Sequence, residues 1–167
     1  MSEGRVLSAG LEALYRKYAP DVFRFALYLS GERSDAEDIT AETFVRVWTS
    51  NEPIQLATVR GYLFTIARNL FLQGRRRDAR NVALGEHLEA PRATPYEETE
   101  QRAELAAVMA RLDTLPEIDR AAVIMRAEHD LPYAEIARAL GISLSAAKVK
   151  VCRARMVLGG IRTGASQ

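Results

Sequence analysis

The residues of this chain that could do chemistry are mostly cations, and they gather in two places. From Lys148 to Arg162 there are five lysines and arginines and no acid, and from Arg60 to Arg80 there are six arginines and one aspartate. Lys and Arg bind phosphate groups and attract nucleic acid of any sequence. Helices that merely face water usually mix both signs of charge. The two cationic stretches therefore indicate contact with nucleic acid.

The stretch from residue 133 to residue 158 predicts a helix-turn-helix, in which a short turn containing glycine joins two helices. Gly141 stands where a helix commonly ends in a left-handed residue, and Ser143 is a good N-cap for the second helix. Apolar residues at helical spacing predict one buried stripe on each helix: Tyr133, Ile136, Ala137 and Leu140, then Ala147, Val151, Ala154 and Leu158.

The second of these helices has an outward face that suits the major groove of duplex DNA. Small and apolar side chains can lie against base edges and thymine methyl groups, while flanking cations hold phosphates. Arg153 is the central residue that could pair with guanine. The residues predicted to contact duplex DNA are Ser145, Lys148, Val149, Lys150, Cys152, Arg153 and Arg155. Considered alone, the pattern also fits a basic, solvated helix of an α-helical bundle.

The second cationic stretch, residues 59–80, predicts a helix whose buried stripe contains Leu63, Ile66, Ala67 and Leu70. Its arginines alternate with Tyr62, Phe64 and Phe71. Aromatic rings stack on unpaired bases and arginine holds the backbone, so this mixture suits melted or single-stranded nucleic acid. The aromatic residues also suit a protein core, and we expect Phe71 to be buried.

An acidic helix is predicted before this stretch, at residues 34–50. Ser34 and Glu37 have the spacing of a capping box, which would start the helix at this serine. Its apolar side contains Ile39, Phe44, Val47 and Trp48, and its narrow polar stripe contains Asp35, Asp38, Glu42 and Arg46. Such a stripe is either a solvated face or a surface that docks on a basic partner.

A further helix is predicted at residues 11–29, and it should kink or break at Pro20.

Composition and charge predict an all-α protein of two helical domains. The chain has 167 residues, of which 48% are hydrophobic and 27% charged. Residues 1–80 have a net charge of +2, residues 81–100 of −4 and residues 101–167 of +3. We therefore expect domains at 1–80 and 101–163, joined by an acidic linker at 81–100 that contains two prolines. No apolar run approaches the roughly 20 residues of a membrane-spanning helix, so we expect a cytoplasmic protein without membrane insertion.

Enzymatic chemistry is not favoured. Glu128, His129 and Asp130 are adjacent, and on a helix they would point in three directions, while His87 lies in the linker. No metalloprotease, phosphate-loop or nucleophile-elbow motif occurs. The single cysteine, Cys152, excludes an internal disulfide or a cysteine metal cluster. We expect no catalytic residue, no metal and no cofactor.

The order of these parts resembles the extracytoplasmic-function, or group IV, sigma factors of bacterial RNA polymerase. The matching pieces are AEDITAETFVRVW, GYLFTIARNLFLQGRRR, LDTLPEIDRAAVIMR, LPYAEIARALGIS and AAKVKVCRARMVL. Each piece is weakly specific, but five pieces in this order and spacing are strongly so. The resemblance implies a region 2-type domain, a flexible acidic linker and a region 4-type helix-turn-helix domain.

The resemblance also implies a role for each part of the chain. The acidic helix would clamp the core polymerase through Asp35, Asp38, Glu42, Arg46 and Trp48. The melted −10 promoter element would be held by residues of the loop at 51–59 and of the following helix: Asn51, Ile54, Arg60, Tyr62, Arg68, Asn69, Arg75 and Arg76. The helix from Leu144 to Met156 would bind the −35 element as duplex. An anti-sigma factor would be a further candidate partner.

Three positions depart from the pattern of this family. Members often have threonine where Ala146 stands and a small polar residue where Val149 stands, so the −35 preference stays open. Many have tryptophan in place of Tyr62. The alternative function is a free-standing helix-turn-helix regulator whose N-terminal half senses a signal or dimerises. That alternative leaves the helix of arginines and aromatic residues unexplained.

Overall fold

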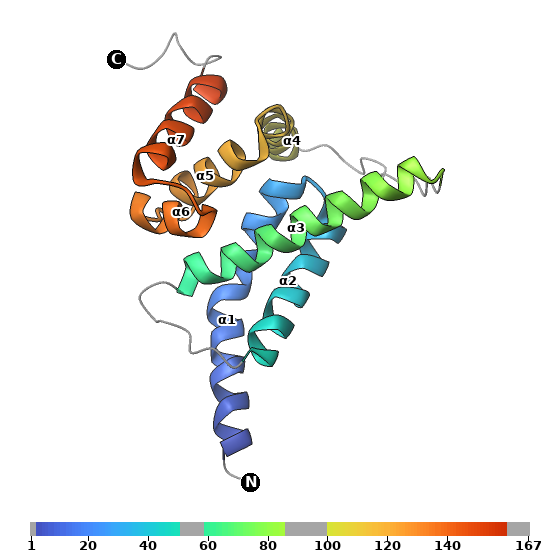
Figure 1. Cartoon of the computed structure of the whole chain (residues 1–167), viewed down its shortest axis with the longest axis vertical. Coiled ribbons are helices and arrows are strands. Elements are labelled where there is room, and N and C mark those ends of the chain that lie inside the picture. The colour runs from blue at the N-terminus through green and yellow to red at the C-terminus, as the bar shows by residue number, and fades with distance from the viewer. Residues whose placement is uncertain (1–2, 51–58, 86–99, 160–167) are drawn as a thin grey trace.

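The computed structural model describes residues 3–50, 59–85 and 100–159, with the side chains of residues 3–9 excepted. All regular structure in these ranges is helical, which confirms the expected all-α fold (Figure 1). No helix of the described ranges has the length and hydropathy needed to cross a membrane. The helices are α1 (Glu3–Ser30), α2 (Arg33–Thr49), α3 (Val59–Ala83), α4 (Glu100–Asp113), α5 (Glu117–Ala127), α6 (Tyr133–Leu140) and α7 (Leu144–Gly159).

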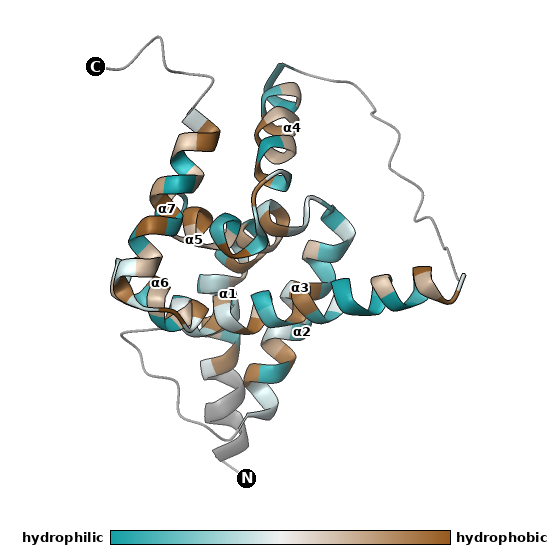
Figure 2. Cartoon of the chain, turned by 45° about the horizontal axis from the view of Figure 1, so that its top comes forward, coloured by the Kyte–Doolittle hydropathy of each residue, from teal (hydrophilic) through white to brown (hydrophobic). Residues whose placement is uncertain are grey.

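The first half of the chain is a three-helix unit in which α1, α2 and α3 each contact the other two. Phe25 of α1 stacks on Phe64 of α3 with ring centroids 4.6 Å apart, and both side chains are fully buried. The remaining buried apolar residues of this unit include Val22, Ala26, Leu29, Ile39, Phe44, Val47, Leu63, Ala67 and Phe71. The far part of α3 extends beyond this unit and is largely hydrophilic up to its tip (Figure 2).

We expected a kink or a break at Pro20; helix α1 continues through this residue, so a break is wrong. Proline inside a helix removes one backbone hydrogen bond and crowds the preceding turn. The residues that follow it, Val22, Phe25 and Leu29, are almost completely buried in the core. Their burial requires the helix to continue, and this packing outweighs the local cost of the proline.

The expected capping box at the start of α2 is also wrong. The N-cap is Glu32, which has no side-chain capping hydrogen bond, so Ser34 lies inside the first turn. Glu37 accepts a hydrogen bond from the Arg33 side chain at 3.1 Å instead of capping the helix. Gly31 explains the earlier start, because its φ of 76° turns the chain out of α1 immediately before Glu32.

The helix-turn-helix predicted for the C-terminal half is present as α6 and α7. Helix α6 ends at Gly141 with φ 65°, and Ser143 Oγ accepts a hydrogen bond from the Ala146 amide at 3.1 Å. The predicted stripe of α7 is buried at Ala147, Val151 and Ala154 and half-buried at Leu158. The local sequence signals therefore identified this motif correctly.

The two halves of the chain pack against each other. Helix α5 lies against α1, and α6 lies against α3 (Figure 1). Arg120 of α5 is only 4% exposed and donates a hydrogen bond to the Leu29 carbonyl of α1 at 2.7 Å. The buried apolar residues of both halves form one continuous cluster. The chain thus has one joined core, although its cationic stretches lie in different halves.

Candidate nucleic-acid interface

Most of the residues predicted for the outward face of α7 are exposed in the structure. Cys152 and Arg153 are exposed, and Val149 is exposed although it is apolar. The other predicted contacts that lie exposed on this helix are Ser145, Lys148 and Arg155. A helix with cations beside small and apolar side chains can enter a major groove, because it meets both phosphates and base edges.

Lys150 differs from the other predicted contacts of α7. It is half-buried, and its Nζ lies 3.4 Å from Oδ1 of Asp119, a carboxylate of α5 that is itself buried. The ion pair ties α7 to α5 within the helix-turn-helix domain. Lys150 therefore holds α7 against α5 in this structure, and its ammonium group is not free to contact a phosphate.

On α3, the arginines predicted to hold the melted strand separate into two groups. Arg68 is 15% exposed and makes a bidentate ion pair with Glu117 of α5, with distances of 2.6 and 2.8 Å. Arg60 donates to the His129 carbonyl at 2.9 Å and lies 3.6 Å from Asp21 of α1. Both arginines thus face the second half of the chain, where it packs on α3.

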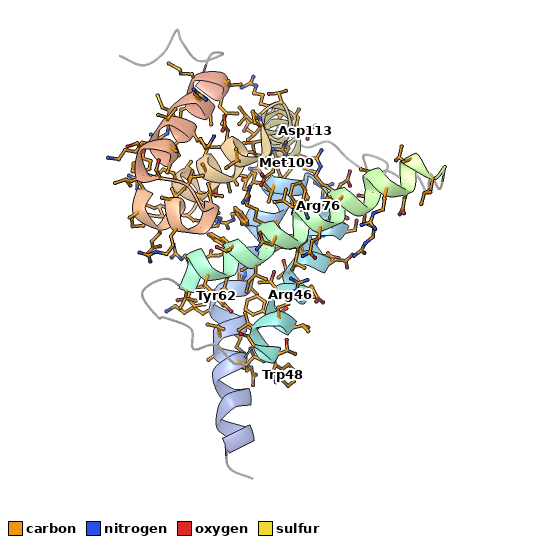
Figure 3. The ribbon with its side chains drawn as sticks, viewed as in Figure 1. Arg46, Trp48, Tyr62, Arg76, Met109 and Asp113 are labelled. Atoms are coloured by element: carbon orange, nitrogen blue, oxygen red, sulfur yellow. The ribbon has the colours of Figure 1, made fainter. Side chains whose placement is uncertain are left out.

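The second group lies further along α3 and is exposed. It contains Arg75 and Arg76, and the predicted contact Asn69 is exposed as well. Arg75 lies over the ring of the buried Phe71, with its guanidinium carbon 5.4 Å from the ring centroid. The core assignment of Phe71 is confirmed, and Phe64 is buried as well. Tyr62, near the N-terminal end of α3 in Figure 3, is half-buried.

The polar stripe of α2 lines a groove of about 420 Å³ between α2 and α3. Both signs of charge occur in it: Asp35, Asp38, Glu42 and Arg46 from α2, and Arg75, Arg77 and Asp78 from α3. Arg46, labelled in Figure 3, donates to Gln73 at 3.2 Å, and this hydrogen bond joins the two walls. Partial burial raises the pKa of the Asp35 carboxyl, and the nearby Asp78, Glu32 and Asp38 carboxylates add to this rise. A cationic partner bound here would relieve that repulsion.

Trp48, which the sequence pattern places on the apolar side of α2, is not buried with the other residues of that side. Its side chain is 69% exposed and stands at the C-terminal end of the helix (Figure 3). Ile39, Phe44 and Val47 fill the core without it. Because Val45 is exposed on the same helix, α2 presents apolar surface beside its charged stripe.

Asn51 and Ile54, predicted to hold the melted −10 element, lie outside the described residues. His129 is a residue whose part in the structure the sequence did not reveal. It is 4% exposed, and its ring centroid lies 4.6 Å from that of Phe64. Glu128 pairs with Arg24, and Asp130 pairs with Arg126, so the three adjacent polar residues do diverge. Within the described residues, no group of three or more His, Cys, Asp or Glu side chains could hold a metal ion.

The arrangement defines a DNA-binding protein with two helical modules, and comparison with known proteins identifies both modules. Residues 14–81 match the model of sigma-70 region 2, and residues 105–158 match that of sigma-70 region 4. The extracytoplasmic-function (ECF) RNA polymerase sigma factor SigE of Mycolicibacterium smegmatis is 38% identical over 155 residues, which cover 88% of this chain and 59% of SigE. The ECF sigma factor SigL of Mycobacterium tuberculosis is 32% identical over 152 residues, which cover 86% of this chain and 84% of SigL.

Solved structures show the same fold. The sigma factor RpoE of Bartonella quintana, solved in complex with the anti-sigma factor NepR, superposes with a TM-score of 0.75 at 24% identity, over 93% of this chain and 98% of RpoE. CnrH, solved with the cytosolic domain of CnrY, superposes with a TM-score of 0.67 at 22% identity, over 97% of this chain and 98% of CnrH. These two likenesses concern the fold.

The chain belongs to the extracytoplasmic-function family of RNA polymerase sigma factors. Proteins of this family are transcription initiation factors, which direct RNA polymerase to promoters. The alternative of a free-standing regulator is not favoured, because the region 2 match covers the N-terminal half that this alternative left unexplained.

Proposed function

We propose that this sigma factor uses three separate surfaces during initiation. Helix α2 binds the core polymerase, α3 with the preceding residues holds the melted −10 element, and α7 binds the −35 element as duplex. The corresponding domains are residues 1–80 and 101–163, with residues 81–100 as the linker. We also propose that the protein works in the cytoplasm and has no catalytic group of its own, because polymerase carries out the chemistry.

The outward face of α7 is the observation that carries this proposal. The helix is seated by Ala147, Val151 and Ala154, which are fully buried, so its opposite face is held outward. That face has cations at its flanks and apolar groups near its centre, as described above. Phosphate contacts orient a protein on DNA, and base-edge contacts select the sequence. The arrangement can do both.

The second support for the proposal is the division of charge on the first half. The exposed arginines of α3 can hold a phosphate backbone. Helix α2 presents the carboxylates of Asp35, Asp38 and Glu42, which can attract a cationic partner although Arg75 and Arg77 line the same groove. RpoE was solved in complex with the anti-sigma factor NepR, and CnrH was solved in complex with the cytosolic domain of CnrY. We therefore include an anti-sigma factor among the proposed partners of this chain, together with core polymerase and promoter DNA.

Run-off transcription tests the function directly. Purified chain and core polymerase are combined with a library of promoter fragments, and selected start sites are sequenced. We expect a subset of fragments to yield transcripts that are absent with core polymerase alone. If the chain bound duplex DNA specifically without polymerase and added no transcript, the regulator function would replace this one.

A first prediction concerns sequence selection by α7. Arg153→Ala should relax preference at one or two −35 positions, because a bidentate arginine–guanine contact discriminates by about 1–3 kcal/mol. Lys148→Ala should weaken binding to all sequences alike and flatten the salt dependence by about one unit of slope. Holoenzyme binding to a −35 substitution series measures both effects. A common loss on every promoter with Arg153→Ala would make Arg153 a phosphate anchor.

A second prediction concerns the polymerase surface on α2. Reversing Asp38 and Glu42 together to lysine should weaken core-polymerase binding about tenfold at moderate salt, because two attractive contacts become repulsive. The fold should be retained, since substitutions of exposed helical charges change stability by about 0.5 kcal/mol. Competition with the unaltered chain for labelled core polymerase measures the loss. The matched control is Glu12→Lys on α1, whose exposed carboxylate lies outside the groove. Equal affinity of the double variant and the control would exclude this surface.

A further inference from the structure

The α3 stripe that faces the second half of the chain contains two of the arginines proposed to hold the melted strand. Arg60, Phe64 and Arg68 follow one another at intervals of four residues, so they lie on one face of the helix. Each contacts the second half: Arg60 at the His129 carbonyl, Phe64 at the His129 ring and Arg68 at Glu117. This face of α3 is therefore covered while the halves are packed together.

The contact between Arg68 and Glu117 uses the same chemistry as a contact with phosphate. Nε and Nη2 of Arg68 each donate to one carboxylate oxygen, at 2.6 and 2.8 Å. Arginine holds a phosphate through the same planar pair of donors. The two side chains are 15% and 18% exposed, so water screens the pair less than it would screen an ion pair on the surface. Glu117 and a DNA phosphate cannot occupy these donors together.

We propose that Glu117 is an intramolecular competitor for Arg68, an autoinhibitory contact that weakens the grip of the free chain on single-stranded DNA. The inference rests on the −10 role proposed above for Arg68. Arg75 and Arg76 lie further along α3 and stay exposed, so the packed form retains some affinity for a backbone. Full use of the stripe requires α5 and α6 to leave α3, which separates the halves.

Separation of the halves would break polar contacts at the edge of this interface and would also open the apolar cluster that the halves share. Glu128 lies 3.9 Å from Arg24 of α1. The Thr65 hydroxyl donates to the Gly61 carbonyl at 2.7 Å and lies 3.4 Å from the Ala139 carbonyl of α6. Water or phosphate can replace such contacts when the halves part. Binding that favours the separated state, by DNA or by another protein, would shift the population toward it.

The experiment compares Glu117→Gln with Glu104→Gln in the free full-length chain. The first substitution keeps the size of the side chain and removes the charge that holds Arg68. The second removes an exposed charge of α4 in the same half of the chain. Affinity for a fluorescein-labelled single-stranded DNA of mixed sequence is measured across a range of salt. Small-angle X-ray scattering without DNA reports whether the halves separate.

We expect Glu117→Gln to bind the labelled strand about fivefold more tightly than Glu104→Gln. Its affinity should depend more steeply on salt, by about 0.7 of a unit for one additional phosphate contact. The radius of gyration should increase for Glu117→Gln only. Equal affinity of the two variants would overturn the proposal, whether or not the scattering changed.

A separate measurement distinguishes this failure from a failure of the proposed function. Arg68→Ala is tested in the holoenzyme for formation of the open complex on a promoter that the run-off assay has selected. Reduced open complex, together with equal DNA affinity of the two glutamine variants, would leave Arg68 its −10 role and exclude only the competition by Glu117. Unchanged open complex would remove the role of Arg68 and the competition with it.

Discussion

Replacing Arg120 by alanine should lower the free energy of unfolding by about 3 kcal/mol, because buried carbonyl groups would lose a charged donor. The guanidinium donates to the Leu29 carbonyl at 2.7 Å, to that of Leu115 at 3.1 Å and to that of Asp113 at 3.3 Å. Burial lowers the pKa of Arg120, but arginine stays protonated in proteins. The loss corresponds to a decrease in melting temperature of about 10 °C for a chain of this size.

Arg120 has this effect because it lies where two helices end. The Leu29 carbonyl belongs to the last turn of α1, and Asp113 and Leu115 lie at the end of α4 and in the turn to α5. The last carbonyls of a helix have no partner within that helix, and a cation beside them is favourable. One guanidinium therefore serves both ends and links the two halves.

Chemical denaturation of the purified variants measures the effect of Arg120. Arg120→Lys should recover only part of the stability, since an ammonium group does not span three carbonyls as a planar fork does. Arg138→Ala on the exposed side of α6 is the matched control, and its free energy of unfolding should change by about 0.5 kcal/mol or less. If Arg120→Ala were as stable as the control, the link between α5 and α1 would not contribute to stability.

The parts of the fold that the sequence predicted correctly depend on local signals. Gly141 ends α6 because a left-handed residue is needed there, and Ser143 caps α7 through its own hydroxyl. Each of these features depends on a few neighbouring residues, as does the spacing that buries Val151. The capping box predicted at Ser34 was wrong because the turn at Gly31 makes Glu32 the N-cap of α2.

The contacts between the halves could not be predicted from local patterns. Arg68 and Glu117 are 49 positions apart, and Arg60 and His129 are 69 apart. An arginine that will bind phosphate and an arginine that will bind a distant carboxylate have the same appearance in a sequence. Trp48 illustrates the same limit, because spacing placed it on an apolar side that other residues had already filled. Only the packing of the second half on α3 shows which of its arginines bind partners within the chain.

The stability of the packed halves should fall in acid because of His129. Burial lowers the pKa of its imidazole to about 4, against 6.5 in the unfolded chain. The nearby Arg60 and Arg24 also disfavour the charged form, while Asp21 on α1 favours it. A lowered pKa means that the folded state prefers the neutral ring. The contribution of His129 is therefore fully present above pH 6.5 and is lost as the pH falls from 6.5 toward 4.

The expected loss is roughly 2 kcal/mol between pH 7 and pH 5, since each unit of pKa difference is equivalent to about 1.4 kcal/mol. The surroundings of the ring explain why protonation is costly. Its Nε2 has no hydrogen-bond partner within the described residues, and the rings of Phe25 and Phe64 lie beside it. An imidazolium buried there would have a donor without an acceptor.

His129→Leu separates this effect from the titration of carboxylates, which also begins near pH 5. The variant removes the ionisable ring and leaves every carboxylate in place, so its stability should decrease less between pH 7 and pH 5 than that of the unaltered chain. Urea denaturation at both pH values gives the two differences. Identical pH dependence in the two proteins would mean that the imidazole has the same pKa in the folded and in the unfolded chain. A smaller decrease in His129→Leu would show that the imidazole couples acidity to the packing of the two halves.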